Sequence, residues 1–97
     1  MQIAKATEVL LTLDKPRRFL YDLNALVELE EIYGSQEKAF EGVRTGKLKH
    51  ILNVFWACLV HEDSSLTVKD VGRIFSRTDP DIIVELSDII LKAATSE

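Results

Sequence analysis

Three glutamates close together are the first residues of this chain whose types and spacing could do chemistry. Glu28, Glu30 and Glu31 lie within four residues of one another, and paired carboxylates can act as general acid and base. Such a pair needs an apolar pocket that separates the two pKa values. Here the glutamates alternate with apolar residues as on the polar side of an amphipathic helix. We therefore predict a solvated helix face.

A cysteine, a histidine and a glutamate form the second candidate group. Cys58, His61 and Glu62 are about one helical turn apart, so two of them could share a metal ion. A closed zinc site needs four ligands, and His50, the only other histidine, precedes His61 by eleven residues. That is about 16 Å along a helix, too far for one ion. No third group that would orient a Cys–His nucleophile pair is recognisable either. We expect no metal, no cofactor and no enzymatic activity.

Two loop motifs also fail in detail. The segment 63–74 begins with aspartate like an EF-hand loop, but Val68 and Ile74 stand where glycine and glutamate are required. Gly42 and Gly46 lack the preceding strand and the following Lys-Ser/Thr of a phosphate-binding loop. Neither calcium nor phosphate binding is predicted.

Charge argues against nucleic acid as a partner. The formal net charge is −4; residues 1–50 hold eight basic and eight acidic residues, and residues 51–97 hold four and eight. An acidic half repels phosphate backbones. Successive helices could form a helix-turn-helix motif. Arg73 and Arg77 alone, however, are too few side chains for its second helix to recognise DNA bases. The acidic half is predicted to be a solvated surface or a face for a basic partner.

Length and composition indicate what kind of domain holds these residues. The chain has 97 residues, of which 46% are hydrophobic and 29% charged, which predicts one soluble domain over residues 1–97. No apolar run approaches the length of a membrane span. A lone cysteine excludes an internal disulfide framework. The segment Met1–Leu13 does not have the pattern of a signal peptide, so we expect a reducing cytoplasm.

The elements predicted along the chain are a hairpin and a series of helices. Two β-tolerant segments flank the turn Asp14-Lys15-Pro16, which predicts a β-hairpin over residues 8–21. Residues 22–94 then predict four to five helices, so the fold class is mainly α, a small helical bundle with an N-terminal β-hairpin. The expected helix caps are Asp22 or Asn24, Ser35 with Lys38 as its N3 residue, Thr67 with Asp70, and Asp79 before Pro80, with Gly34 as a left-handed C-cap.

Apolar periodicity predicts which helix faces turn inward. The helix 47–61 carries apolar residues nearly all round and is expected at the centre of the core. Its predicted stripe is Leu48, Ile51, Leu52, Phe55 and Leu59, with Val54, Trp56 and Val60 off it. In the first helix, Leu26, Leu29 and Tyr33, with Leu23, Val27 and Ile32 beside them, make a wide apolar face. Gly72 within a helix predicts close helix packing.

Three segments carry a resemblance to a known family. The first is TLDKPRRFLYDLNALVELEEIYG, residues 12–34, which is similar to the hairpin and the Asp-Φ-Asn-Ala-Leu-x-Glu-Leu-Glu helix start of the tail assembly chaperones of long-tailed bacteriophages, prophages and gene-transfer agents. The matching positions are Asp22, Leu23, Asn24, Ala25, Leu26, Glu28, Leu29 and Glu30. The second is LKHILNVFWACLVHED, residues 48–63, which resembles the family's LWAxLxHED helix end at Phe55, Trp56, Ala57, Leu59, His61, Glu62 and Asp63. Residues 66–71 are similar to its LTxxEVG continuation, with Asp70 in place of glutamate.

The resemblance implies a role in virion assembly without catalysis. Such proteins bind the tape-measure protein in the host bacterial cytoplasm, keep its hydrophobic helices soluble and help the tail-tube protein to assemble around it. They are absent from the finished virion, and many also occur in a longer frameshifted form. A structural phage component, such as a head–tail connector or minor tail protein, is the alternative, and a small DNA-binding regulator is a weaker one.

A chaperone of this kind needs exposed apolar surface on a soluble body. Trp56, Val84 and Leu91 lie outside the predicted core stripes, and Val84 and Leu91 are seven residues apart, on one side of the last helix. These three are the predicted partner-binding residues, or the surface through which the chain forms a homo-oligomer. The alternative is a core that encloses all three.

Overall fold

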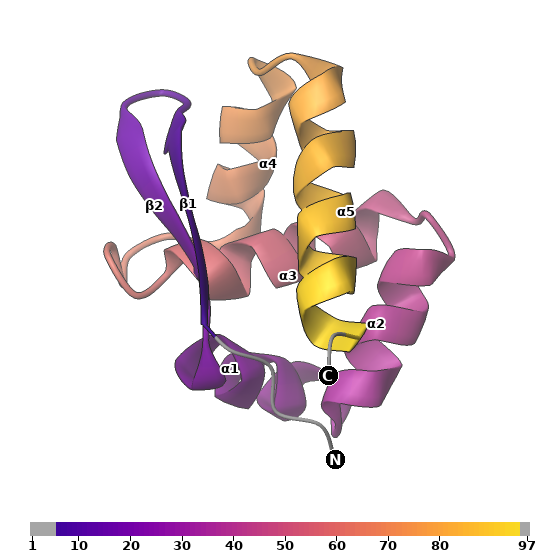
Figure 1. The fold of residues 1–97 in the computed structure, drawn as a ribbon. Helices are drawn as coiled ribbons and strands as arrows, with labels where there is room; N and C mark the ends of the chain where they lie inside the picture. Colours follow the sequence, from indigo (N-terminus) through magenta and orange to yellow (C-terminus); the bar gives the residue numbers. More distant parts are fainter. Residues whose placement is uncertain (1–5, 96–97) are drawn as a thin grey trace.

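A hairpin precedes five helices in the structure, a computed structural model that describes residues 6–95 (Figure 1). The elements are β1 (Thr7–Thr12), β2 (Pro16–Tyr21), α1 (Leu23–Tyr33), α2 (Gln36–Arg44), α3 (Leu48–Leu59), α4 (Val68–Ser76) and α5 (Pro80–Thr95). The predicted fold class, mainly α with an N-terminal β-hairpin, is confirmed. Within residues 6–95, none of the helices combines the length and the apolar character needed to cross a bilayer.

The hairpin is a two-stranded antiparallel sheet whose register runs from Thr7 opposite Tyr21 to Thr12 opposite Pro16. Its turn is shorter than predicted, because Pro16 begins β2 and does not belong to the turn. Alternate residues of β2 are buried, namely Arg17, Phe19 and Tyr21. This buried face lies on α3 and α1, which provide the cover that a lone hairpin needs in water.

Local capping chemistry fixes the helix starts. Asp22, and not Asn24, caps α1 by accepting a hydrogen bond from the N–H of Ala25 at 3.0 Å. Thr67 and Asp70 form a reciprocal capping box at α4, with bonds of 3.1 and 2.9 Å. Ser35 and Asp79 accept the predicted bonds at α2 and α5. Gly34 ends α1 with φ at 87°, the left-handed conformation that favours glycine.

Helix α3 lies at the centre of the core, as predicted, and contacts β2, α1, α2 and α4. Phe55 meets Phe19 of the hairpin edge to face, with ring centroids 5.3 Å apart. The predicted stripe of α3 was wrong at two positions. Val54 is fully buried, although it was placed off the stripe, and Leu48 is exposed, although it was placed on it.

The last helix runs antiparallel to α4, passes α3 and ends near α2 (Figure 1). Its residues Leu86 and Ile90 are fully buried and join the common core. The close packing predicted at Gly72 of α4 is not observed. A β-carbon at that position would meet the Cδ1 atom of Leu52 at 3.6 Å, an ordinary van der Waals distance.

Candidate protein-binding surface

A groove between α1 and the end of α3 brings together residues that are about 30 positions apart in sequence. Its volume is about 410 Å³, and it is lined by Asn24, Ala25, Glu28, Ala57, Val60, His61 and Ser64. We call it the α1–α3 groove. Five of these residues, Asn24, Ala25, Glu28, Ala57 and His61, are positions on which the family resemblance rests. The first two resembling segments, 12–34 and 48–63, therefore meet at one place on the surface.

Other residues of the resembling segments hold the fold. Leu26 and Leu29 are buried in the core. The indole N–H of Trp56 donates to the carbonyl oxygen of Leu66 at 2.7 Å, which ties α3 to the loop before α4. Asp63 accepts a hydrogen bond from the N–H of Ser65 at 3.1 Å and shapes that loop. These positions have a structural explanation that does not require a partner.

The end of α3 also holds the hairpin. The Nε2–H of His61 donates to the carbonyl oxygen of Arg18 at 3.1 Å, and Glu62 accepts from the backbone N–H of Arg18 at 3.4 Å. The Arg18 guanidinium pairs with Glu8 of β1 at 2.7 Å and with Glu62 at 3.6 Å. The hydrogen bonds to Glu8 raise the pKa of Arg18 above its usual value. His61 and Glu62 thus both hold the backbone of the hairpin at Arg18.

A second ion pair stabilises the turn of the hairpin. The Nε–H and Nη2–H groups of Arg17 donate hydrogen bonds to the two carboxylate oxygens of Asp14, at 2.7 and 2.9 Å. Arg17 is only 7% exposed and is the only buried charged residue in the described part of the chain. The hydrogen bonds from Arg17 lower the pKa of Asp14. Asp14 in turn raises the pKa of Arg17, and Asp63 and Glu62 add to that effect at longer range.

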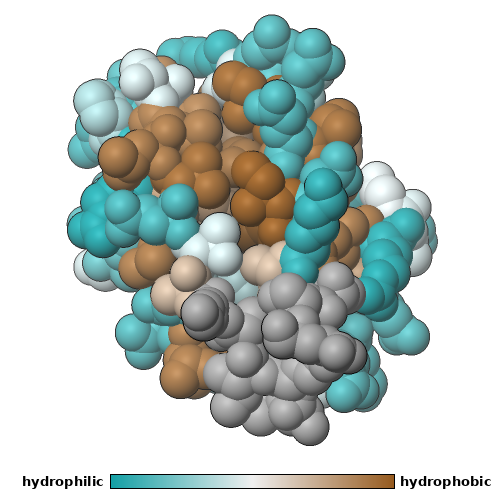
Figure 2. All heavy atoms as spheres, in the orientation of Figure 1, coloured by the Kyte–Doolittle hydropathy of each residue, from teal (hydrophilic) through white to brown (hydrophobic). Residues whose placement is uncertain are grey.

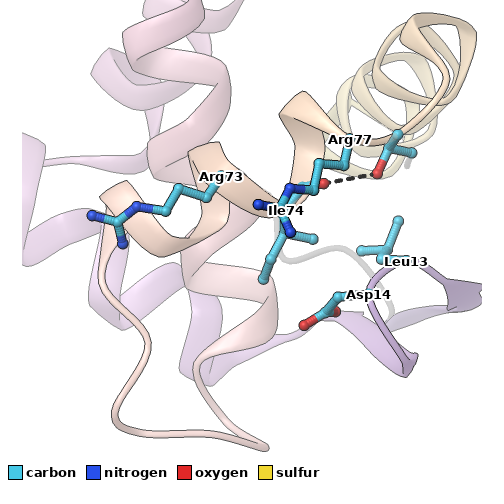
Figure 3. Close-up of a pocket in the computed structure, with 6 residues that line it drawn as sticks. Leu13, Asp14, Arg73, Ile74 and Arg77 are labelled. Atoms are coloured by element: carbon cyan, nitrogen blue, oxygen red, sulfur yellow. Dashed lines mark hydrogen bonds between the residues drawn. The ribbon is translucent and has the colours of Figure 1, made fainter.

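A second groove lies between the hairpin turn and the end of α4 (Figure 3). It has a volume of about 410 Å³ and is lined by Leu13, Asp14, Arg73, Ile74, Arg77 and Thr78. Asp14 is held by Arg17, and Arg73 is held by Asp70 at 2.8 Å and points away from the turn. Asp14 and Arg73 are therefore already paired with residues outside the lining of this groove.

Large apolar side chains are exposed on several elements. Those between 46% and 71% exposed are Leu10, Leu23, Val27, Ile32, Leu48 and Val84. Leu23 and Val27 are one turn apart on α1, the helix that forms one wall of the α1–α3 groove. Apolar side chains also gather over the hairpin, α4 and α5 on the face shown in Figure 2. The apolar surface is therefore not confined to one helix.

Sequence reasoning missed most of these exposed residues. It placed Leu23, Val27 and Ile32 on the inner face of the first helix, and all three are exposed. The buried face of α1 is narrower and consists of Ala25, Leu26 and Leu29. The spacing gave no warning, since Leu23, Leu26 and Val27 follow the i, i+3, i+4 pattern that is typical of a buried face.

The three predicted partner-binding residues have different environments. Val84 is exposed on α5. Trp56 and Leu91 are half-buried and pack against the core. The premise that all three are surplus to the core is thus wrong for Trp56 and Leu91. A partner-binding role for each remains a prediction.

The residues weighed for chemistry have different environments. Glu30 and Glu31 are exposed, and Glu28 lines the α1–α3 groove. Burial raises the pKa of the Cys58 thiol well above its usual value. His50 lies against α1, where its Nδ1 is 2.6 Å from the Tyr33 hydroxyl oxygen. Over the described residues, no three His, Cys, Asp or Glu side chains form a cluster that could hold a metal ion.

Comparisons of the chain with family models, with curated proteins and with solved structures give no match.

Proposed function

We propose that this chain is a non-enzymatic tail assembly chaperone of a long-tailed phage, prophage or gene-transfer agent. In this role it binds the tape-measure protein in the host bacterial cytoplasm, keeps it soluble and assists assembly of the tail-tube protein around it. The observation that carries the proposal is the α1–α3 groove, where two of the segments that resemble the family, 12–34 and 48–63, meet.

The composition of this groove suits a helical client. Ala25, Ala57 and Val60 are the apolar residues of its lining, and Asn24, Glu28 and His61 add polar groups to it. Small apolar residues allow a partner helix to approach closely, and the polar groups can select its register. The exposed Leu23 and Val27 extend the apolar surface of α1 beyond the groove.

Charge supports the same role. The exposed Glu30 and Glu31 follow Val27 on α1, and the whole chain has a formal net charge of −4. Net charge keeps a protein with exposed apolar surface soluble and limits association with itself. A chaperone that presents apolar side chains to its client needs this balance.

The test is co-expression with the tape-measure protein encoded near it, the product of a very long gene with coiled-coil character. We expect the client to move from the pellet to the soluble fraction and to co-purify with the tagged chain. If the client stays insoluble with and without the chain, and no complex is captured, the proposal is wrong.

Purified virions separate this role from that of a structural component. A chaperone leaves before the virion is complete, so we expect the chain in lysates of assembling cells and not in mature particles. Stoichiometric amounts in purified particles would instead identify a connector or minor tail protein.

A further inference from the structure

The two outer edges of the hairpin differ in whether other residues of the chain form hydrogen bonds to them. The outer edge of β2 is covered at Arg18, whose N–H and carbonyl oxygen bond to Glu62 and His61. The same edge begins with Pro16, which has no N–H to offer another strand. For the residues that the structure describes, no hydrogen bond is made by the outer edge of β1. Within residues 6–95, it is therefore the β1 edge that is left open to a further strand.

The bonds at Arg18 also fix which groups of β1 face outward. Because the backbone groups of Arg18 point away from β1, Arg18 and Leu10 form a non-hydrogen-bonded pair of the antiparallel ladder. The N–H and carbonyl oxygen of Leu10 must then point to the free edge. The direction of the backbone groups alternates along a strand, so the N–H and carbonyl groups of Glu8 and Thr12 also point to the free edge.

This open edge has few of the features that protect edge strands. The β1 sequence TEVLLT contains no lysine and no proline, and its pairing with β2 is continuous, without a bulge. Leu10 is 71% exposed, the highest value among the large apolar residues that the structure describes. An apolar side chain at the centre of an open edge favours pairing with another strand.

We propose that β1 pairs antiparallel with β1 of a second copy of this chain, in the register centred on Leu10. Leu10 then lies opposite Leu10 of the second copy, and Glu8 lies opposite Thr12. In each of these pairs both residues have their backbone groups pointing outward, so both N–H···O bonds of each pair can form. The two hairpins become one four-stranded sheet, which is more stable than separate two-stranded hairpins.

The side chains of β1 favour this register, and they favour a second copy of the chain as the strand that pairs with the open edge. A shift of two residues in either direction would place Leu10 opposite Glu8 or Thr12, whereas the proposed register pairs leucine with leucine on the outer face. Glu8 is the only charged residue of β1, and it faces threonine, so no like charges meet. On the inner face, the half-buried Val9 would lie opposite Leu11 of the other copy. The strand is thus complementary to itself.

Mass measurement tests the proposal independently of any client. In sedimentation or light scattering at rising concentration, we expect the wild-type chain to reach about twice its 11.0 kDa mass. Leu10→Lys should stay monomeric with unchanged helical circular dichroism, because lysine blocks edge pairing. Leu48→Lys, at an exposed leucine of α3, is the matched control and should dimerise like the wild type. A monomeric wild type, or a dimer that Leu10→Lys leaves intact, overturns the proposal.

Disulfide trapping tests the register. In the proposed pair the Cα atoms of the two Leu10 residues are about 5.5 Å apart, within the range that a disulfide spans. Leu10→Cys should therefore cross-link rapidly with diamide as oxidant. Thr12→Cys should not, because the two Thr12 residues would be about 13 Å apart along the strands. The native Cys58 is buried, so the wild type serves as the blank. Equal cross-linking of the two variants overturns the register.

Discussion

Gly42 of α2 lies directly against the imidazole ring of His50 in α3. A β-carbon at position 42 would stand 2.6 Å from Cγ of that ring and 2.9 Å from its Nδ1. The ring is held in place, because its Nδ1 is 2.6 Å from the Tyr33 hydroxyl oxygen, and Asn53 donates to that oxygen at 2.9 Å. The contact joins α1, α2 and α3 around a small polar cluster.

This contact predicts that Gly42→Ala destabilises the protein. Alanine in a helix is favoured over glycine by about 1 kcal/mol, but the clash must displace the ring and break its bond to Tyr33. We expect a net loss of about 1–3 kcal/mol in the free energy of unfolding, measured by urea denaturation. The double variant Gly42→Ala/His50→Ala should show less than the sum of the two single losses. A neutral or stabilising Gly42→Ala would contradict the packing described.

Gly72→Ala is the matched substitution with the opposite expected sign. Gly72 is also helical, and a β-carbon there would have only Leu52 nearby, at the comfortable distance of 3.6 Å. The gain in helix propensity should therefore appear as about 0.5–1 kcal/mol of added stability. The same denaturation experiment measures it, and a loss of stability would show that α4 and α3 approach more closely than the structure has them.

The two glycines illustrate what the sequence could and could not predict. Helix starts followed from local chemistry, since Asp22, Ser35 and Thr67 each cap through a bond to a residue three positions later. Close approach between helices depends on which neighbour faces a residue, and periodicity within one helix does not contain that information. For this reason the close packing predicted at Gly72 occurs at Gly42, and Val54 is buried in place of Leu48.

The Asp14–Arg17 pair predicts a pH-dependent contribution to stability. The depressed pKa of Asp14 means that its contribution is present above the pKa of the unfolded chain, about 3.9, and is lost as pH falls through the folded value. At pH 7, Asp14→Asn should cost about 1 kcal/mol, because Asp14 is 43% exposed and solvent screens the pair. The difference between the two proteins should shrink below about pH 4, which unfolding curves at several pH values measure. A difference that stays constant down to pH 2 would argue against the ion pair.

Glu62 predicts a local effect on the hairpin. Its carboxylate accepts from the backbone N–H of Arg18 and pairs with that residue's guanidinium. Glu62→Ala should lower the free energy of unfolding by less than about 1 kcal/mol, because the pair is on the surface. The amide of Arg18 should nevertheless exchange with deuterium several-fold faster, as followed by NMR. Glu30→Ala, at an exposed residue of α1, should leave that rate unchanged, and equal rates in all three proteins would mean that Glu62 does not cover the strand edge.

The candidate surface was harder to predict than the fold. The segments that resemble the family were recognised as separate stretches, but their meeting in the α1–α3 groove depends on how α1 crosses α3. Likewise Trp56 was selected because it lies off its helical stripe, yet its indole reaches the backbone of Leu66 in the next loop. Both outcomes are set by contacts between elements that a single helix pattern does not describe.

The two candidate client surfaces lead to different expectations. Val27 is exposed on α1 beside Glu28, which lines the α1–α3 groove, whereas Val84 is exposed on α5 and was selected from the sequence. Because both side chains are mostly in water, Val27→Glu and Val84→Glu should each change stability by less than about 0.5 kcal/mol. If α1 carries the client, Val27→Glu should reduce the soluble tape-measure protein in co-expression at least several-fold, and Val84→Glu should not. The reverse result would move the client surface to α5, and the same yield from both variants and the wild type would exclude both residues from it.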